Sequence, residues 1–448
     1  MLRHITKVCC LILLAAGAQR ASAFSLLGDY EAWQQPSVSF RIVSSTRAQL
    51  GGSRNIGEEY RINTPVITYG FESSFLDYFG SNGVRAVDQA FAILNKLPAA
   101  SKASKDLSEF LTDDAQRSVE SAIALNLLDL KSEVLGFMME QMGLCGEEHV
   151  FDLRSRGAPS GAPACTFNYT VIVRNFDPFT YEPSHYVNGV LYTYQIFDGC
   201  PAIDRGDAVE TLVDPTDVYF NAVASFGQNI GGYFIGLTRD DFGGLRYLYR
   251  KNNYNNEVLP PNTFPQTSSS PWTPVDFFTT NSVTATNTAA LRGGIEKITF
   301  KKVKFDSLLG TSFTPFVQTY SLPYVTGSAV VKQTVKRLVS SPDILFTAAD
   351  LADPNPAAIP FVINRSTRSI SFATNAVNVS AGPGTILPQK VITFNKIGPY
   401  FRNSTSFFIE DTGFKGFLWA SFDGTTNDPI VYPQGSSIRD LEAQVLSH

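Results

Sequence analysis

The segment GLTRDDFGGLRYLYR, residues 236–250, places two adjacent carboxylates, Asp240 and Asp241, among arginines and tyrosines. Such a combination of ionisable side chains in one short stretch has the composition of a chemical site. The same residues also describe a helix, because Thr238 and Asp241 form an [ST]-x-x-[DE] capping box and apolar residues then recur on one face. Acids in a first turn also favour the helix dipole. We therefore predict a helix in which both carboxylates have a structural role.

Histidine-based catalysis has few candidates in this chain. Beyond the first residues the only histidines are His149, His185 and His448, which are far apart in sequence. His185 lies beside Tyr186 in a strand pattern, which indicates an ordinary strand residue rather than a general base. The chain also has no G-x-S-x-G, P-loop or G-x-G-x-x-G motif. We assign no catalytic residue and expect no cofactor.

Two short motifs have both a functional and a structural interpretation. Asp411-Thr412-Gly413 matches the tripeptide of aspartic proteases, but those enzymes need two such carboxylates, and the single copy indicates a strand and turn. The stretch FDGTTNDP offers oxygen ligands that a calcium ion could use. A plain turn needs the same residue types, and we prefer it. The four candidate calcium ligands are Asp423, Thr425, Asn427 and Asp428.

The first 23 residues have the pattern of a secretory signal peptide. A basic start precedes an apolar run from Val8 to Ala16, and Ala21-Ser22-Ala23 forms a small-x-small exit. We predict cleavage after Ala23 and a protein that is secreted, periplasmic or at the cell surface. No later stretch approaches the roughly 20 apolar residues of a transmembrane helix.

The chain that remains after this cleavage has 33 basic and 41 acidic side chains, a formal net charge of −8. Nucleic acid is therefore excluded as a partner, because phosphate binding needs a basic face. Three cysteines remain: Cys145, Cys165 and Cys200. In an oxidising compartment we expect one disulfide and one thiol, and we prefer a bond between Cys145 and Cys165, which would close a short loop. Four N-x-[ST] sequons start at Asn168, Asn364, Asn378 and Asn403.

The pattern of residues 24–254 predicts an α/β domain with helices packed on a mixed sheet. A strand over 60–71 precedes a helix that Pro98 ends, and a longer helical region over 113–144 stops at Gly143. Its methionines, Met138, Met139 and Met142, are expected to fill the core. Strand patterns follow from 167, with a hairpin turn at Asn188-Gly189.

Residues 255–274 are rich in Pro, Ser, Thr and Asn, which predicts a linker. Short strand patterns separated by turn residues then cover 275–435 and predict an all-β sandwich, so that the whole chain is α+β. One of them, KITFKKVKF, carries lysines suited to the solvent side of a strand. The last segment, 436–448, is predicted to be a disordered or weakly helical tail.

The order of strand, helix, long helix, β region and closing "DD..G...LY" helix resembles matrixin-like (metzincin) zinc proteinases. The resemblance covers the first domain only, and it implies a zinc ion held by three histidines of an HExxHxxGxxH motif. The matching stretch here, EVLGFMMEQMGL, contains no histidine. The resemblance therefore implies an inactive relative that has lost its metal.

A second resemblance spans both predicted domains. The phrases DPFTYEPSHYVNGVLYTYQI, SPDILFTAADL and FDGTTNDPIVYPQG are similar to an uncharacterised family of large exported bacterial proteins, which implies export and a two-part architecture. Our leading hypothesis is an exported, non-enzymatic structural or binding protein whose partner is a protein or a cell-surface glycan. The alternative is a secreted hydrolase, most simply a diverged or inactive metallopeptidase-like protein.

Overall fold

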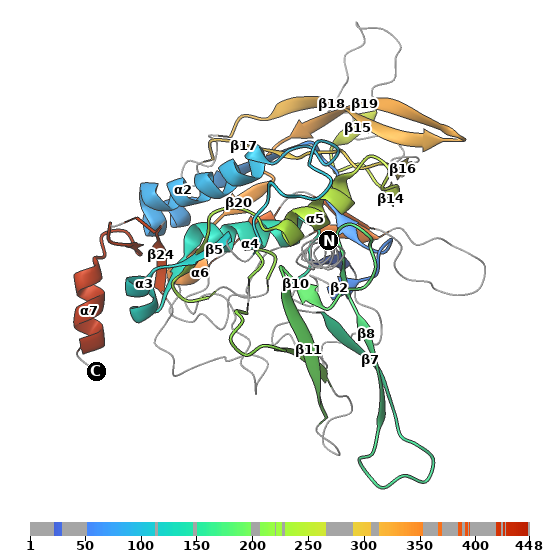
Figure 1. Ribbon diagram of the computed structural model, residues 1–448. Helices are drawn as coiled ribbons and strands as arrows, with labels where there is room; N and C mark the ends of the chain where they lie inside the picture. Colours follow the sequence, from blue (N-terminus) through green and yellow to red (C-terminus); the bar gives the residue numbers. More distant parts are fainter. Residues whose placement is uncertain are drawn as a thin grey trace, which may run out of the picture.

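The structure is a computed structural model, and it has a mixed α+β fold in which short strands predominate (Figure 1). The predicted leader up to Ala21 lies outside the described residues. Among those residues, no helix combines the length and the apolar character needed to cross a membrane. The described residues are 22–28, 52–112, 115–146, 150–198, 207–219, 221–225, 229–265, 290–305, 313–352, 366–369, 384–387, 390–392, 394, 418–422, 424–425 and 427–446.

A parallel sheet of four strands forms the centre of the fold. The order is β17-β4-β20-β23, with bounds Thr299–Lys302, Val66–Phe71, Ile344–Phe346 and Lys390–Ile392. The strand predicted over 60–71 is divided into β3 (Tyr60–Arg61) and β4. The lysines of edge strand β17 are exposed and its Phe300 is buried, as the sequence predicts.

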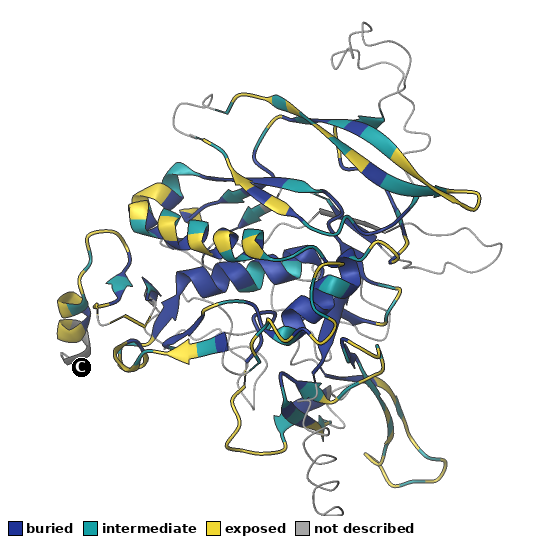
Figure 2. Cartoon of the chain, turned by 45° about the horizontal axis from the view of Figure 1, so that its top comes forward, coloured by how far each residue is buried: buried dark blue, intermediate teal, exposed yellow. Residues whose placement is uncertain are grey.

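Helix α2 (Ser73–Lys96) follows β4 and covers this sheet, with α4 (Leu130–Met142) beneath it. Figure 2 shows that α2 keeps an exposed outer face, whereas α4 is buried along most of its length. Their shared core is aromatic, because it joins Phe75, Phe79 and Phe91 of α2 to Phe346 and Phe394 from distant segments. All three methionines of α4 lie in this core, so the prediction that they are core residues is confirmed.

The single helical region predicted over 113–144 is wrong. The chain there forms β5 (Gln116–Ser118), a short α3 (Glu120–Ala124), β6 (Leu127–Asp129) and then α4. Asn126 has a positive φ of 53°, which ends α3, and the side chain of Asp129 caps α4 by accepting from Ser132 N. The predicted stop at Gly143 is confirmed, since Gly143 has a φ of 113°.

The separate β-sandwich predicted over 275–435 is not formed in the described residues. Strands of this half complete sheets of the first half instead, because β17, β20 and β23 join β4, β22 (Gly384–Leu387) pairs with β3, and β24 (Leu418–Ser421) pairs with β6. The alternation of apolar and polar residues in one strand does not show which distant strand it pairs with. The two halves therefore share one core.

The described part of the predicted linker, 255–265, contains two short strands. β14 (Asn255–Glu257) pairs with β16 (Ala290–Arg292), and β15 (Thr263–Pro265) pairs with β19 of a long hairpin, while 266–274 lie outside the described residues. The C-terminal segment contains helix α7 (Ile438–Leu446), in agreement with the helical alternative. The other elements are β18 (Phe316–Thr326), β19 (Ala329–Val339), β13 (Gly232–Phe234), β21 (Ser366–Ser369), β25 (Ile430–Val431) and α6 (Ala349–Ala352).

Strand β1 (Phe24–Gly28) is buried along its whole length. It lies between β2 (Gly52–Arg54) and β9 (Asn175–Phe176), and the backbone of Leu27 also donates to Gly143 O at 2.9 Å. The helix predicted for the opening segment, α5 (Arg239–Tyr249), packs against β1. The segment 22–28 is thus an internal part of the fold.

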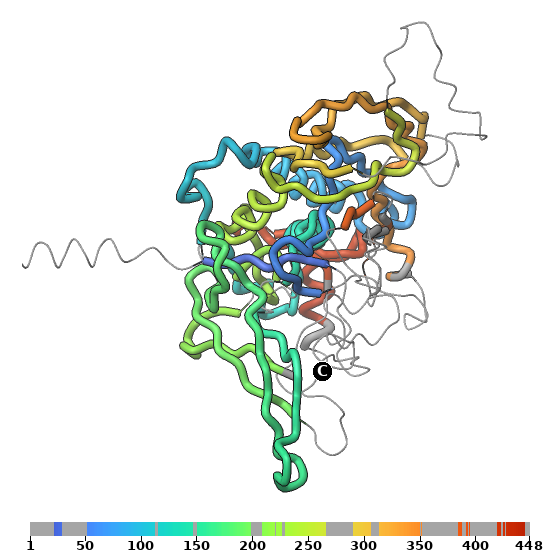
Figure 3. Tube along the Cα trace, turned by 90° about the vertical axis from the view of Figure 1, so that its right-hand side faces the viewer, coloured from blue at the N-terminus to red at the C-terminus, as the bar shows by residue number. Residues whose placement is uncertain are grey.

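Five strands form a lobe that projects from the rest of the molecule (Figures 1 and 3). A small apolar core that includes Val150, Phe151, Tyr192 and Ala208 holds the lobe together. The predicted Asn188-Gly189 turn is confirmed, with φ values of 46° and 87°. The strands of the lobe are β7 (Phe151–Gly157), β8 (Asn168–Val173), β10 (Tyr186–Val187), β11 (Val190–Phe197) and β12 (Asp207–Leu212).

Candidate functional site

Helix α5 confirms the helical interpretation of the segment with the two carboxylates. Thr238 is its N-cap, and the capping box is complete: Thr238 Oγ1 accepts from Asp241 N at 3.2 Å, and Asp241 Oδ2 accepts from Thr238 N at 2.8 Å. Thr238 and both acids are fully buried. The start of α5 is therefore an internal polar site rather than an exposed helix end.

Replacing Thr238 by alanine is expected to lower the free energy of unfolding by about 1–2 kcal/mol, because the N-cap acceptor is lost inside the protein. Urea unfolding of the purified variant measures this change. The matched control is Thr326→Ala at the exposed end of β18, for which we expect a change within about 0.5 kcal/mol. Equal effects of the two substitutions would contradict the capping role.

Asp241 has a complete set of hydrogen-bond donors. Besides the N-cap residue, its carboxylate accepts from Val223 N at 3.1 Å and from Ala224 N at 2.8 Å. Burial raises the pKa of Asp241, and these hydrogen bonds act in the opposite direction. Asp241 thus ties the segment 221–225 to the first turn of α5, which is a structural role.

Asp240 is less completely paired. Its Oδ2 accepts from Ala23 N at 2.8 Å and from Asn188 N at 2.5 Å, whereas no described group donates to its Oδ1. Burial raises the pKa of Asp240 to about 7, against the effect of the two backbone donors. Of the two acids, Asp240 is therefore the one whose carboxylate can still accept a hydrogen bond from a further donor or cation.

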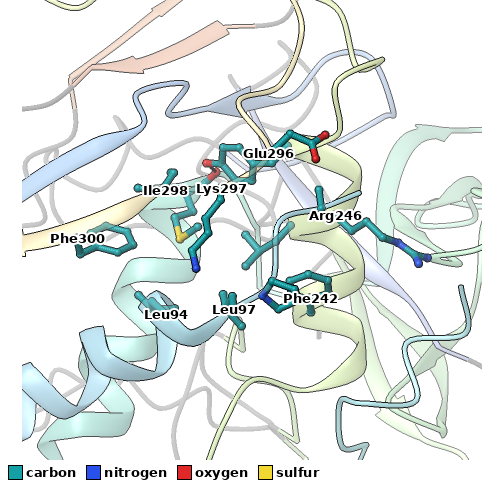
Figure 4. A pocket seen from close by; sticks show the side chains of 13 residues that line it. Leu94, Leu97, Phe242, Arg246, Glu296, Lys297, Ile298 and Phe300 are labelled. Atoms are coloured by element: carbon teal, nitrogen blue, oxygen red, sulfur yellow. Dashed lines mark hydrogen bonds between the residues drawn. The ribbon is translucent and has the colours of Figure 1, made fainter. Parts of the chain in front are cut away.

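A small hollow, partly open to solvent, lies on the other side of α5 (Figure 4). Its wall is apolar, formed mainly by the ends of α2 and α5 and by the segment before β17. The apolar residues in the wall are Leu94, Leu97, Pro98, Ala100, Met142, Phe242, Leu245, Ile298 and Phe300. Such a lining suits a small apolar group.

The charged side chains at this hollow already bind the backbone. Arg246 donates to the carbonyls of Ser104 and Pro178 at 3.1 and 3.0 Å, and Lys297 donates to Asn95 O at 2.8 Å. Glu296 accepts from Ser101 N and Lys251 N, both at 3.1 Å. These groups hold the backbone of the loops around the hollow.

The stretch that corresponds to the matrixin zinc motif lies in α4 and is packed in the core. A Cβ atom added to Gly136 would lie 3.2 Å from Val223 O, so the backbone of 221–225 approaches the helix closely at this point. His185 is exposed, with its ring edge-on to Phe151 at 5.0 Å, and His149 lies outside the described residues. Within the described ranges no three His, Cys, Asp or Glu side chains are grouped as metal ligands.

The other predicted sites are only partly described. Asp423 lies outside the described residues, while Thr425, Asn427 and Asp428 are exposed and Asn427 N donates to Thr425 Oγ1 at 3.3 Å, as in a turn. Asp411-Thr412-Gly413, three of the four sequons and His448 also lie outside. Asn168 is exposed at the start of β8.

The disulfide bond predicted between Cys145 and Cys165 is wrong. Cys145 is a buried thiol, so the bond between Cys145 and Cys165 is not formed. Cys165, in the loop between β7 and β8, is disulfide-bonded. Cys200 lies outside the described residues.

An exposed apolar surface on the lobe was not predicted from the sequence. Five of the 14 large hydrophobic side chains that are exposed in the described residues lie between 194 and 219. We call β11, β12 and the following segment 213–219 the ribbon. The segment folds back on the strands, because Tyr219 OH accepts from Leu212 N at 3.2 Å and its ring lies 6.1 Å from that of Tyr192. The five exposed side chains are Tyr194, Phe197, Val213, Val218 and Tyr219.

The only sequence signal for this surface is its composition. The described part of the ribbon contains four carboxylates and no lysine or arginine, and aromatic residues alternate with polar ones in β11. Comparison of the chain with known protein families, with curated proteins and with solved structures finds no match.

Proposed function

We propose that the protein is an exported, non-enzymatic binding protein that contacts its partner through the ribbon. The observation that carries the proposal is the concentration of exposed aromatic and apolar side chains on a projecting lobe. Exposed apolar clusters mark interaction surfaces, because leaving them in water costs free energy that a partner removes. The lobe has a small core of its own, so the ribbon is held in shape before a partner binds.

The negative charge of the ribbon supports a positively charged partner. Asp214 and Asp217 are exposed next to Tyr219, and no basic side chain of the described ribbon balances them. A polypeptide surface rich in Lys and Arg fits this arrangement, since it supplies cations both to carboxylates and to aromatic faces. The lobe already contains such a contact, with the guanidinium of Arg156 at 3.8 Å from the centroid of the Phe167 ring.

The experiment compares the parent protein with the triple variant Tyr194→Ala, Phe197→Ala, Tyr219→Ala. Binding to an immobilised arginine-rich peptide is expected to weaken at least about tenfold, because each ring over a cation contributes about 0.5–1 kcal/mol. The matched control is Tyr254→Ala: Tyr254 and Tyr194 are each 40% exposed, but Tyr254 lies outside the lobe. None of these substitutions changes the net charge.

Three outcomes decide the proposal. Loss of binding in the triple variant alone, with binding that weakens as salt is added, supports it. Equal binding by all three proteins contradicts it. Binding of the parent to a neutral polysaccharide, insensitive to salt and lost in the triple variant, would replace the basic polypeptide with a glycan partner.

A further inference from the structure

Ala23 and Phe24 lie on one face of α5. Asp240, Gly244 and Tyr247 are spaced at i, i+4 and i+7, so they share that face. Ala23 N donates to Asp240 Oδ2 at 2.8 Å, and the ring of Phe24 stacks on Tyr247 with centroids 5.7 Å apart. Gly244 allows this approach, because a Cβ atom there would lie 3.1 Å from Phe24 Cβ.

The carboxylate at the top of this face has no counter-charge among the residues that the structure describes. Its donors among the described residues are the uncharged backbone N–H groups of Ala23 and Asn188, the uncharged hydroxyl of Ser22 lies beside it and lowers its pKa, and its Oδ1 accepts no hydrogen bond from these residues. The nearest ionisable neighbour, Asp241, has the same sign. A buried carboxylate without a cation is costly, and a cation that reaches it is strongly bound.

The predicted leader cleavage creates a cation at this place. Hydrolysis of the bond between Ala23 and Phe24 adds one water: Ala23 leaves with the new carboxylate, and Phe24 keeps the nitrogen, which is protonated to an ammonium at neutral pH. Both residues are fully buried in the folded chain. The cleavage must therefore precede folding, and the α-ammonium forms before β1 takes its place.

We propose that the Asp240 carboxylate is the binding site for the α-ammonium group of the mature chain, carried by Phe24. This inference rests on the export stated in the proposed function and on the cleavage after Ala23 that the sequence predicts. Neighbouring Cα atoms are about 3.8 Å apart, so the nitrogen of Phe24 starts within one residue of the position that Ala23 N occupies. Removal of Ser22 and Ala23, both fully buried, frees the space beside the carboxylate. The ring of Phe24 stays on Tyr247 and holds the new terminus there.

Cleavage of the leader therefore supplies the charged donor that the Asp240 carboxylate lacks in the precursor. An ammonium offers three donors, of which one replaces Ala23 N on Oδ2 and another serves the unpaired Oδ1. The precursor offers only neutral donors to the same carboxylate. The folded mature chain is thus stabilised relative to the folded precursor, while the exposed ribbon is the same in both.

The test uses two chains produced from cleavable fusions, one beginning at Phe24 and one at Gln19, each with Asp240 or with Asp240→Asn. In urea unfolding at pH 8, the chain beginning at Phe24 is expected to have an unfolding equilibrium constant at least about tenfold smaller than the longer chain. Asp240→Asn is expected to remove that difference. Equal stability of the two chains, or a difference that persists with asparagine, overturns the inference.

A second measurement does not depend on the variant folding. The α-amine of the chain beginning at Phe24 should react with acetic anhydride at least about tenfold more slowly than in urea, because a paired ammonium is protected; equal rates overturn the inference. Sequencing of the exported protein separates the two proposals. A first residue other than Phe24 refutes the cleavage after Ala23 and the ammonium site with it, whereas Phe24 with unchanged stability refutes the ammonium site alone. Neither result bears on binding by the ribbon, which the triple variant tests.

Discussion

Replacing Arg61 by methionine is expected to lower the free energy of unfolding by about 3–5 kcal/mol. The Arg61 Nε lies 2.5 Å from Glu257 Oε1, and the side chains are 0% and 2% exposed. The guanidinium also donates to the carbonyls of Leu248 at 2.5 Å, Asn253 at 3.1 Å and Arg292 at 3.0 Å. The substitution leaves a buried carboxylate and three buried carbonyls without their donor, and each loss has its own desolvation cost.

The matched control removes a cation of similar length at the surface. Lys302 Nζ lies 2.8 Å from Asp88 Oδ2, but these side chains are 44% and 37% exposed. Lys302→Met is expected to change the free energy of unfolding by less than about 1 kcal/mol, because water solvates both charges. Urea unfolding of both variants measures the contrast. A small effect at Arg61 would show that the pair is dispensable to the junction between β3 and β14.

The second large effect concerns the pH dependence of stability at Asp240. Its pKa is about 7 in the folded chain and about 3.9 in an unfolded one, so the folded state binds the additional proton between these values. When the pKa of a group is higher in the folded than in the unfolded chain, its stabilising contribution to the folded state is complete at pH values below the unfolded pKa. This contribution is lost as the pH rises through the folded pKa. For a chain that retains Ala23, Asp240 therefore contributes a loss of up to about 4 kcal/mol between pH 4 and pH 8.

Asp240→Asn isolates this contribution. Asparagine does not titrate, so the difference in unfolding free energy between variant and parent is expected to shift in favour of the variant as the pH rises from 4 to 8. Two other buried acids with raised pKa values, Asp129 and Glu257, are present in both proteins and cancel in the difference, whereas Asp241 is coupled to Asp240 and this coupling is part of the measured shift. A difference that is independent of pH would show that Asp240 ionises in the folded chain as it does in water. The chain beginning at Phe24 should have a weaker dependence, because an ammonium favours the ionised carboxylate.

The sequence predicts the elements whose signals are local. The capping box at Thr238, the turn at Asn188-Gly189 and the stop at Gly143 each depend on residues a few positions apart, and all three are found. The buried methionines of α4 follow from helical spacing in the same way. Where a conformation depends only on residues a few positions apart, the residue types are sufficient to predict it.

The errors have a common physical cause. The helix predicted over 113–144 is interrupted because β6 pairs with β24, about 290 residues later in the chain. The predicted second domain is absent as a unit for the same reason, since its strands find their partners in β3, β4 and β6. Strand pairing between distant segments is stabilised by backbone hydrogen bonds that carry no residue signature, so alternation reveals a strand but not its neighbour.

The same distinction applies to the candidate sites. The sequence alone determines that Asp240 and Asp241 begin a helix, that no histidine cluster forms a zinc motif, and that the chain starts with a leader pattern. Only the tertiary structure decides that Asp241 is fully paired, that Asp240 meets the backbone of Ala23, 217 residues away in the chain, and that the aromatic side chains of the ribbon remain exposed. Burial and hydrogen-bond partners depend on how distant segments pack, and the proposed binding of a positive charge by Asp240 depends on its burial in the first turn of α5.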